Sequence, residues 1–440
     1  MVHATIRIGQ YEERMVQRPH VIVVGAGLAG LATAYYLQRD GARVTVVDRA
    51  GGPGLETSFA NGALLHASLV EPWNSPGVLW QILRWLGHEH APMLLRPRAI
   101  PGLLSWGPRF ILNSTRRRYD ANTQKNLRLA IFSLGLMRRL RIETPISYQY
   151  QSRGVLAVFR TATLQTLALR RCEELGRHGL SFRPLQRDAL IDLEPALGPI
   201  GERLVGGIHY GTDEGGDAHQ FCVELARVLK EGGAELRFGT AVDAIHHAKG
   251  RIHHLVCGGE EMAADSYVLA AGSYTPLLAR HVGLSLPVRP AKGYSITMPR
   301  SRAPAAAPRI GVADAHLHAV VVPVGDDRVR VAGTAELTGY DLSIHPQRIE
   351  NLKELLRRMF PAFAAQLQEG DFTPWAGLRP MSADGVPILG ATRLSNLYLN
   401  TGHGHLGWTL AAGSGRLVAD VIARRAPALN MRDFELARPL

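Results

Sequence analysis

One arginine lies in the segment WAGLRPMSADGVPILG (375–390), between an apolar run and a turn that contains proline. A guanidinium is costly to bury unless an anion accepts its hydrogen bonds. The one acid in this segment is Asp384. Two alternatives therefore follow for Arg379: it forms an internal ion pair with Asp384, or it binds an anionic ligand.

Residues 20–48 read HVIVVGAGLAGLATAYYLQRDGARVTVVD, a β-branched apolar run, a glycine-rich turn, a helical pattern and a second apolar run. This order predicts a βαβ unit with the G-x-G-x-x-G fingerprint in its first turn. The glycines allow the tight turn, the approach of a pyrophosphate and close packing of the helix, whose N-terminus faces the phosphates. An acid at the end of the second strand receives ribose hydroxyls. The predicted contacts to the dinucleotide are Gly25, Gly27, Leu28, Ala29, Gly30, Asp48 and Arg49.

Two later strands favour FAD over NAD as the dinucleotide. The segments GTAVDAI (239–245) and YVLAAG (267–272) predict strands that return to the first domain, and small residues let the chain pass close to a cofactor. An NAD-dependent enzyme should carry its own histidine or tyrosine–lysine machinery directly after the fingerprint, and residues 71–120 show no such pattern. We predict non-covalent FAD, with further contacts from Val242, Ala271 and Gly272.

A second strand, glycine-rich turn and helix follow near the C-terminus, in NLYLN, TGHGHLG and WTLAAGSGRLVADVIARR (396–425). The N-terminus of such a helix stabilises negative charge, and a reduced flavin gathers negative charge at its pyrimidine end. We predict that this turn lies against the flavin. A helix cap without a ligand is the alternative.

These patterns predict the fold. The runs HAVVVPV and DRVRVAGT (318–334), joined by a Gly-Asp-Asp turn, indicate an antiparallel sheet. We therefore predict an α/β FAD-binding Rossmann-like domain of the glutathione-reductase type and a second, α+β substrate domain with a mostly antiparallel sheet. The predicted boundaries are 20–75, 166–285 and 375–430 for the FAD-binding domain, and 76–165 and 286–374 for the substrate-binding domain.

Seven motifs in order resemble one enzyme family. They are VVGAGLAG, ETSFANG, LVGGIHYGTDEGGDAHQF, AAGSY, KGYS, WAGLRPMSADGVPILG and NTGHGHLGWT. Together they resemble the flavin-dependent D-amino acid dehydrogenases of the small-subunit type, within the superfamily of D-amino acid oxidase and glycine oxidase. The resemblance extends from about Val21 to Ile422 and so covers nearly the whole chain.

The resemblance implies roles for individual residues. In that family the arginine of the W-x-G-L-R-P segment binds the substrate carboxylate, which here is Arg379. The segment KGYS (292–295) is expected as a turn at the sheet edge near the flavin, with Tyr294 either in the pocket wall or packed in the core. The loop expected to cover the flavin contains Thr57, Ser58, Ala60, Asn61 and Gly62. The turn expected at its pyrimidine end contains His403, Gly404, His405, Gly407, Trp408 and Thr409.

Three positions depart from the pattern of that family. Leu64 stands where glutamine is usual, His318 where tyrosine is frequent, and His405 where threonine is frequent. The two extra imidazoles would bind a polar side chain of the substrate or the electron acceptor; surface histidines with no role are the alternative. We predict His318 as a catalytic residue together with Arg379 and Tyr294.

The resemblance also implies a reaction. With the carboxylate held and the Cα–H directed at flavin N5, a neutral amine expels a hydride, and water hydrolyses the imino acid to a 2-oxo acid and ammonia. No enzymic base is required, and activity should rise with pH as the substrate ammonium loses its proton. The alternatives are an oxygen-using oxidase of glycine, sarcosine or a D-amino acid, and a dehydrogenase of a cyclic imino acid such as D-hydroxyproline.

Basic and aromatic residues gather in one stretch. Seven arginines and one glutamate lie between Gln81 and Arg118, where tryptophans alternate with Leu, Ile and Met. Such segments suit the headgroup region of a membrane, and similar dehydrogenases pass electrons to quinone. A lid or a dimer face is the alternative. The net charge of +12 favours anionic partners. An RNA-binding flavoprotein is a third class, but the lysine-rich stripe of such proteins is missing, and we predict no nucleic-acid partner.

The sequence also predicts a compartment. No run approaches the roughly 18 apolar residues of a spanning helix, and residues 1–20 lack the apolar centre of a secretory signal, so they read as a short tail. Three scattered cysteines, Cys172, Cys222 and Cys257, argue against a disulfide or metal framework. We predict a cytoplasmic protein without a metal site, and leave open a peripheral contact with the inner face of the membrane.

Overall fold

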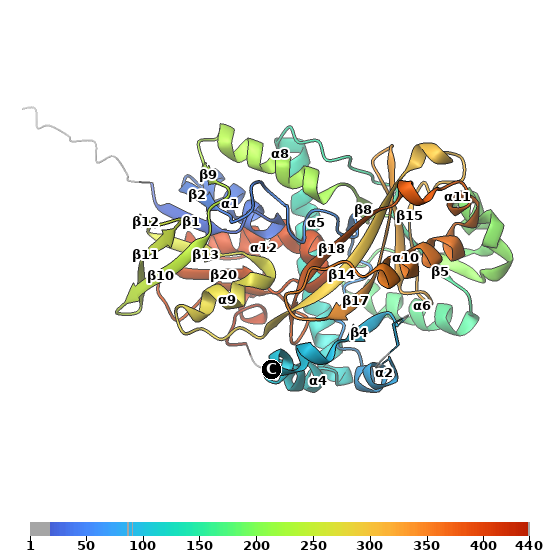
Figure 1. Cartoon of the computed structure of the whole chain (residues 1–440), viewed down its shortest axis with the longest axis horizontal. Coiled ribbons are helices and arrows are strands. Elements are labelled where there is room, and N and C mark those ends of the chain that lie inside the picture. Colours follow the sequence, from blue (N-terminus) through green and yellow to red (C-terminus); the bar gives the residue numbers. More distant parts are fainter. Residues whose placement is uncertain (1–17, 86–87, 90, 439–440) are drawn as a thin grey trace, which may run out of the picture.

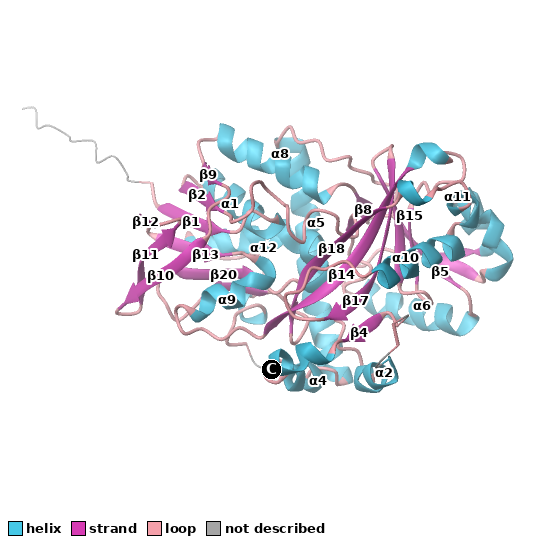
Figure 2. Cartoon of the chain, in the orientation of Figure 1, coloured by secondary structure: helices cyan, strands magenta, loops and turns pink. Residues whose placement is uncertain are grey.

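The computed structural model describes residues 18–85, 88–89 and 91–438. Most of the predicted N-terminal tail, residues 1–17, lies outside this part of the chain. Two sheets dominate the fold, with helices packed on both of them (Figure 1; Figure 2). The cavity that carries the candidate site is lined by residues from both sheets.

The first sheet has six strands in the order β19-β20-β13-β1-β2-β9. All neighbours pair in parallel except the edge strand β19, which is antiparallel to β20. The strands are β19 (Ile388–Ala391), β20 (Leu397–Thr401), β13 (Ser266–Leu269), β1 (His20–Val24), β2 (Arg43–Val47) and β9 (Glu235–Arg237). Because β1, β2 and β13 are buried on both faces, they consist mainly of β-branched and other apolar residues.

Helices cover one face of this sheet, and a small antiparallel sheet covers the other. The helical layer shares one apolar core and consists of α1 (Leu28–Arg39), α5 (Arg116–Glu143), α8 (Ala218–Glu231) and α12 (Gly407–Ile422). Opposite it lie β10 (Val242–Ala248), β11 (Arg251–Cys257), β12 (Glu260–Met262) and α9 (Thr275–Arg280). Glycines let α12 approach its neighbours: a Cβ at Gly413 would lie 2.9 Å from Ser133, and one at Gly415 2.7 Å from Ala32.

The second sheet is mostly antiparallel and runs in the order β18-β14-β17-β16-β15-β5-β7-β6, with β4 paired to the end of β17. Its strands are β18 (Thr373–Ser382), β14 (Val288–Pro299), β17 (Arg328–Leu337), β16 (Ala319–Val324), β15 (Gly311–Asp314), β5 (Val155–Phe159), β7 (Gly206–Tyr210), β6 (Arg183–Gln186) and β4 (Met93–Leu95). The predicted hairpin at 318–334 is confirmed as β16 and β17.

Two groups of helices pack on this sheet. On one face, α10 (Pro346–Met359) and α11 (Pro361–Ala364) share an apolar core with the central strands. Three short helices, α2 (Val78–Trp85), α3 (Ile100–Leu103) and α4 (Gly107–Leu112), contact β14, β17 and β18 through a separate cluster. We call these three helices the α2–α4 layer; α2 and α4 are seen near β4 in Figure 1.

Several segments differ from the sequence-based boundaries. The strands β6, β7 and β18 belong to the second sheet, although 166–285 and 375–430 were predicted for the FAD-binding domain. Conversely, α5 lies in 76–165 and packs in the core beneath the first sheet. The predicted turn KGYS is wrong: residues 292–295 lie inside β14, which is hydrogen-bonded on both sides, to β17 and to β18. Within the described residues, no helix has both the length and the apolar character needed to cross a membrane.

Candidate active site

A cavity of about 850 Å³ extends from the carboxyl ends of β1 and β2 to the strands β14, β17 and β18. It contains nearly every residue that the sequence predicted for the cofactor, together with all three predicted catalytic residues. Two of the predicted cofactor residues, Gly30 and Thr409, are not on its surface. The carboxyl ends of parallel strands are the usual place for a dinucleotide, so the position of the cavity agrees with the fold.

The first glycine-rich turn has the geometry that its sequence predicts. Gly25 adopts φ +117°, and a Cβ there would lie 2.5 Å from the carbonyl oxygen of Ala270. A Cβ at Gly30 would lie 1.8 Å from the carbonyl oxygen of Gly25, so this glycine allows α1 to pack against the turn and does not itself reach the cavity. The N-terminus of α1, at Leu28, therefore borders the cavity directly.

Asp48 ends β2 beside this turn and lies on the cavity surface. Its carboxylate accepts hydrogen bonds from the backbone N–H groups of Ala26 and Ala50, at 2.6 and 2.8 Å. Burial raises the pKa of Asp48 although both hydrogen bonds oppose this shift. Arg49 forms an ion pair with Glu56, and its guanidinium lies 3.7 Å from the ring centre of Tyr274. These side chains lie together at the end of the cavity beside the first glycine-rich turn, and contact with a ribose there stays a prediction.

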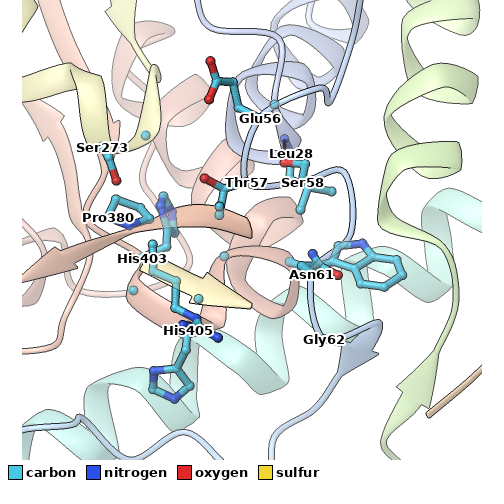
Figure 3. A pocket seen from close by; sticks show the side chains of 18 of the residues that line it. Leu28, Glu56, Thr57, Ser58, Asn61, Gly62, Ser273, Pro380, His403 and His405 are labelled. Atoms are coloured by element: carbon cyan, nitrogen blue, oxygen red, sulfur yellow. Dashed lines mark hydrogen bonds between the residues drawn. The ribbon is translucent and has the colours of Figure 1, made fainter. Parts of the chain in front are cut away.

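The polar loop 56–62 borders the middle of the cavity, as Figure 3 shows for Thr57, Ser58, Asn61 and Gly62. Hydrogen bonds fix this loop to two neighbouring strands of the second sheet. Thr57 donates to the carbonyl oxygen of Leu378 in β18 at 2.7 Å, and Ser295 in β14 donates to the carbonyl oxygen of Ala60 at 2.7 Å. The loop therefore covers the cavity in the position predicted for it.

The second glycine-rich turn lies at the far end, between β20 and α12. Gly402, Gly404 and Gly407 repeat the G-x-G-x-x-G spacing of the first turn. Gly404, His405, Gly407 and Trp408 line the cavity. Thr409 is not on the cavity surface. Its hydroxyl accepts a hydrogen bond from the backbone N–H of His66 at 3.1 Å and so ties the start of α12 to the segment at His66.

Four buried polar atoms belonging to cavity residues have no hydrogen-bond partner among the described residues: the indole Nε1 of Trp408, the hydroxyl of Thr334, Nδ1 of His66 and Oδ1 of Asn400. Buried polar groups are normally satisfied, so such atoms indicate a ligand. Two glycine turns, an acid at the ribose end and unpaired polar atoms at the other end fit an elongated dinucleotide with a polar ring system.

Arg379 lies on β18 and borders this far end. Its guanidinium lies 5.3 Å from the ring centre of Trp73, and it donates one long hydrogen bond, 3.3 Å, to the carbonyl oxygen of Thr334. Within the described residues, no carboxylate forms an ion pair with it. Burial lowers the pKa of Arg379 to about 10. The alternative of an Arg379–Asp384 pair is wrong, because Arg438 pairs with Asp384 at 2.6 and 2.8 Å.

The guanidinium of Arg379 occupies space left by a missing side chain. A Cβ built at Gly293, on the neighbouring strand β14, would lie 2.0 Å from Nη1 of Arg379. Gly293 is the second residue of KGYS. The glycine that suggested a turn therefore serves to admit the arginine next to the strand.

The other two predicted catalytic residues also border the cavity. The hydroxyl of Tyr294 donates to Glu336 at 2.6 Å, and Glu336 is also paired with the buried Lys292 at 3.2 Å. Tyr294 borders the cavity, but its side chain is packed in the apolar core of the second sheet, which is the alternative stated for it above. His318 adopts φ +50°, and its ring centre lies 6.4 Å from that of Trp85. Burial lowers the pKa of His318.

Imidazoles cluster near Arg379. His405 stacks on Trp73 with ring centres 5.5 Å apart, and its Nε2 lies 3.3 Å from the carbonyl oxygen of Leu69. Figure 3 shows His403 and His405 at the same pocket. Burial lowers the pKa of His66 and of His403 to about 4 and that of His405 to about 3, so all three are neutral at pH 7. Within the described residues, no three metal-binding side chains are grouped as a metal site.

Sequence reasoning missed the segment 66–73, which contributes His66, Glu71 and Trp73 to the cavity. Burial raises the pKa of Glu71, and its nearest cation is Arg171, at 3.7 Å. These residues follow no spacing rule, since they lie in a loop between short elements. The single tryptophan of the segment HASLVEPWN, Trp73, was the only signal that the sequence offered.

Comparison with known proteins agrees with this geometry. Residues 20–421 match the DAO family model, described as FAD dependent oxidoreductase. The chain belongs to this family. Its fold class, its FAD cofactor and its general activity as an FAD-dependent oxidoreductase, all predicted from the sequence, are thereby confirmed.

Curated relatives extend over almost the entire chain. A D-amino acid dehydrogenase of Paramagnetospirillum magneticum is 46% identical over 422 residues, which are 95% of this chain and 98% of that protein. A D-amino acid dehydrogenase of Methylobacterium radiotolerans is 42% identical over 420 residues, 95% and 99% of the two chains.

Solved structures share the fold at lower identity. The glycine oxidase of Geobacillus kaustophilus superposes with a TM-score of 0.75 at 23% identity and covers 96% of this chain and 99% of its own. The L-proline dehydrogenase of P. horikoshii also reaches a TM-score of 0.75, at 17% identity, and covers 96% and 97%. At these identities the likeness shows the fold alone.

Proposed function

We propose that this flavoenzyme oxidises the Cα–N bond of D-amino acids to give a 2-oxo acid and ammonia, and passes the electrons to a quinone-type acceptor. The names of the curated relatives support the substrate class. The observation that carries the proposal is Arg379, a part-buried guanidinium at the cavity surface without an ion-pair partner among the described residues.

A substrate carboxylate would supply the missing partner. A guanidinium and a carboxylate form two parallel hydrogen bonds, and a charge-assisted hydrogen bond contributes about 1.5–3 kcal/mol. Gly293 leaves room for the guanidinium at the strand, and Trp73 supports its face at 5.3 Å. Arg379 would hold both oxygens of the carboxylate, which is one substituent of Cα. The Cα–H and the amine are then left to be oriented by the rest of the cavity.

Bound FAD supplies the hydride acceptor. The residues of the chain orient the substrate against it, and proximity accounts for a large share of the rate. Neutral His66, His403 and His405 add no positive charge that would repel the substrate ammonium. The amine must lose its proton before hydride leaves Cα, which needs no dedicated base if the pH is high enough.

The α2–α4 layer supports a membrane-bound acceptor. Its exposed apolar side chains are Leu79, Trp80, Ile100, Leu104 and Leu112. The same stretch of chain carries the exposed arginines Arg84, Arg98 and Arg109, of which Arg98 is paired with Asp341. Apolar anchors with a basic rim suit the anionic inner face of a membrane, and we propose peripheral contact there. Sedimentation with anionic and with neutral vesicles tests this contact; a second copy of the chain on the same surface would instead appear as a dimer without lipid.

The reaction is tested with the purified holoenzyme under anaerobic conditions. D- and L-amino acids are added singly, and the flavin absorbance band is followed; then air or a quinone analogue is admitted. We expect bleaching by D-isomers and rapid recovery with the quinone only. Recovery in air with peroxide would make the enzyme an oxidase. If only a cyclic imino acid such as D-hydroxyproline bleaches the band, the substrate is a secondary amine. No bleaching by any of these compounds would contradict the proposed substrate class.

A further inference from the structure

A second cavity, of about 260 Å³, lies between the α2–α4 layer and the sheet strands β14, β17 and β18. Every side chain that borders it is apolar, apart from the indole N–H groups of Trp73 and Trp106. The Trp106 indole already donates to the carbonyl oxygen of Met381 at 3.0 Å. An apolar lining of this kind selects an apolar ligand, because a polar one would lose its hydrogen bonds to water without replacement.

The second cavity adjoins the first. Trp73 and Met93 border both cavities, and the guanidinium of Arg379 lies over the Trp73 ring at 5.3 Å. Side chains two positions apart on a strand point to the same face, and Arg379 and Met381 of β18 border the first and the second cavity respectively, so both cavities lie on one face of β18. A ligand in the second cavity is therefore separated from the end of the active site by little more than one indole ring.

The second cavity also reaches the molecular surface. Leu104 is 71% exposed and Ile100 is 45% exposed, and both border the cavity. Exposed large apolar side chains next to an apolar cavity indicate an entrance for an apolar ligand. Leu112 is 59% exposed on the same layer but does not border the cavity.

We propose that this cavity binds the electron acceptor, a quinone with a hydrocarbon tail, which enters between α3 and α4. The inference rests on the proposed function, because a quinone acceptor is needed only if the enzyme is a dehydrogenase and not an oxidase that uses oxygen. Substrate oxidation removes a hydride from Cα and a proton from the amine. The quinone takes up the same two electrons and two protons to become a quinol, so each turnover balances without oxygen.

The cavity is tested by binding and by kinetics. Oxidised holoenzyme without substrate is titrated with a benzoquinone that carries a decyl tail, and the quenching of tryptophan fluorescence is measured, since Trp73 and Trp106 border the cavity. Leu104→Glu places a carboxylate at the entrance and should weaken binding by about tenfold or more, because the charge must be desolvated. Leu112→Glu is the matched control with the same charge on the same layer, and binding should be unchanged.

A second variant avoids a charge. A Cβ at Gly107 meets no atom within 4 Å, so the first atom of a larger side chain is accommodated there, and Gly107→Phe places a ring at the cavity border. It should weaken binding of the tailed quinone and slow anaerobic recovery of the flavin band by that quinone. Recovery by a small water-soluble dye, and bleaching by the D-amino acid, should keep the rates of the wild type.

Equal weakening by Leu104→Glu and Leu112→Glu would overturn the proposal, since it indicates general adsorption on the α2–α4 layer. So would unchanged quinone binding in both Leu104→Glu and Gly107→Phe. If these variants instead slow bleaching by D-amino acids with large apolar side chains, the cavity accommodates the substrate. Failure of every D-amino acid to bleach the wild type would contradict the proposed function, whereas the quinone titration would still test the cavity.

Discussion

Two arginines of this molecule, one buried and one part-buried, have opposite surroundings. Arg438, near the C-terminus, donates to both oxygens of Asp384 and to the backbone carbonyls of Pro387 and Val386, among others. Arg379, five residues before Asp384 in the sequence, borders the cavity and, among the described residues, donates only to the carbonyl of Thr334, at 3.3 Å. Although burial alone raises the pKa of Asp384, its pairing with Arg438 holds that pKa below the usual value.

The contrast separates a structural arginine from a binding one. Arg438 has enough acceptors to offset the cost of its burial, and it ties the C-terminal segment to the turn after β18. Arg379 carries the cost of burial without an anionic partner, and its lowered pKa expresses this cost. A charge left without a partner at a cavity surface is a group that the fold keeps for a ligand. The predictions below test this difference.

The largest effect is expected at Arg438. Arg438→Met leaves Asp384 buried and unpaired, which should lower the free energy of unfolding by about 3–5 kcal/mol. Urea unfolding of the holoenzyme measures this loss. The double variant Arg438→Met with Asp384→Leu removes both charges and should recover most of the stability. If the single variant unfolds like the wild type, the ion pair is not what holds this segment.

Arg379→Met should have the opposite profile. Removal of the carboxylate partner should lower kcat/KM for a D-amino acid by roughly 100-fold, as expected for the loss of a charge-assisted pair. The unfolding midpoint should stay the same or rise, because an unpaired buried charge is removed. Anaerobic bleaching rates and urea unfolding, on the same preparation, measure the two effects. A large loss of stability would show that Arg379 has a structural partner like that of Arg438.

Gly293→Ala should have a smaller effect of the same kind. The new Cβ would overlap the guanidinium of Arg379, which must move, whereas the backbone needs no left-handed conformation there. We expect KM to rise by about tenfold with a smaller change in kcat, since a displaced guanidinium binds the carboxylate less well. Gly377→Ala, the register partner on β18, is the comparison variant: there the Cβ would meet Trp375 instead. An unchanged KM in Gly293→Ala would show that Arg379 does not need this space.

The smallest effect is a pH limit. Below about pH 10 Arg379 is charged and can bind a carboxylate; above it, the guanidinium loses its charge. The profile of kcat/KM should rise with pH as the substrate ammonium deprotonates and then fall above about 10. In Arg379→Lys the falling limb should move to lower pH, because a buried ammonium loses its proton more readily than a guanidinium. The same falling limb in both proteins would assign it to another group.

Local patterns in the sequence predicted much of this molecule. The βαβ unit at 20–48 and the hairpin at 318–334 follow from hydrophobic spacing and from glycine turns, and both are present. KGYS was expected as a turn at the sheet edge from the family resemblance, whereas Gly293 lies inside a strand. Its benefit is non-local, since Gly293 makes room for a side chain 86 positions later in the chain.

Contacts between distant segments were beyond the sequence patterns. The second sheet takes its strands from several distant segments of the chain. As a result, β6, β7 and β18 lie in the second sheet and not with the domain predicted for them. The pair of Asp384 with Arg438 could not be foreseen either, because Arg438 lies 54 positions away and in no motif. Likewise Trp73 and Glu71 reach the cavity from a loop whose path is set by the packing around it.

The most direct test of the central claim compares a D-amino acid with its primary amide. The two molecules differ at the group that Arg379 is proposed to hold, and the amide has no negative charge. In the wild type, kcat/KM should favour the acid by roughly 100-fold, and in Arg379→Met this preference should disappear. Equal rates for acid and amide in the wild type, or a preference that survives in Arg379→Met, would contradict the account.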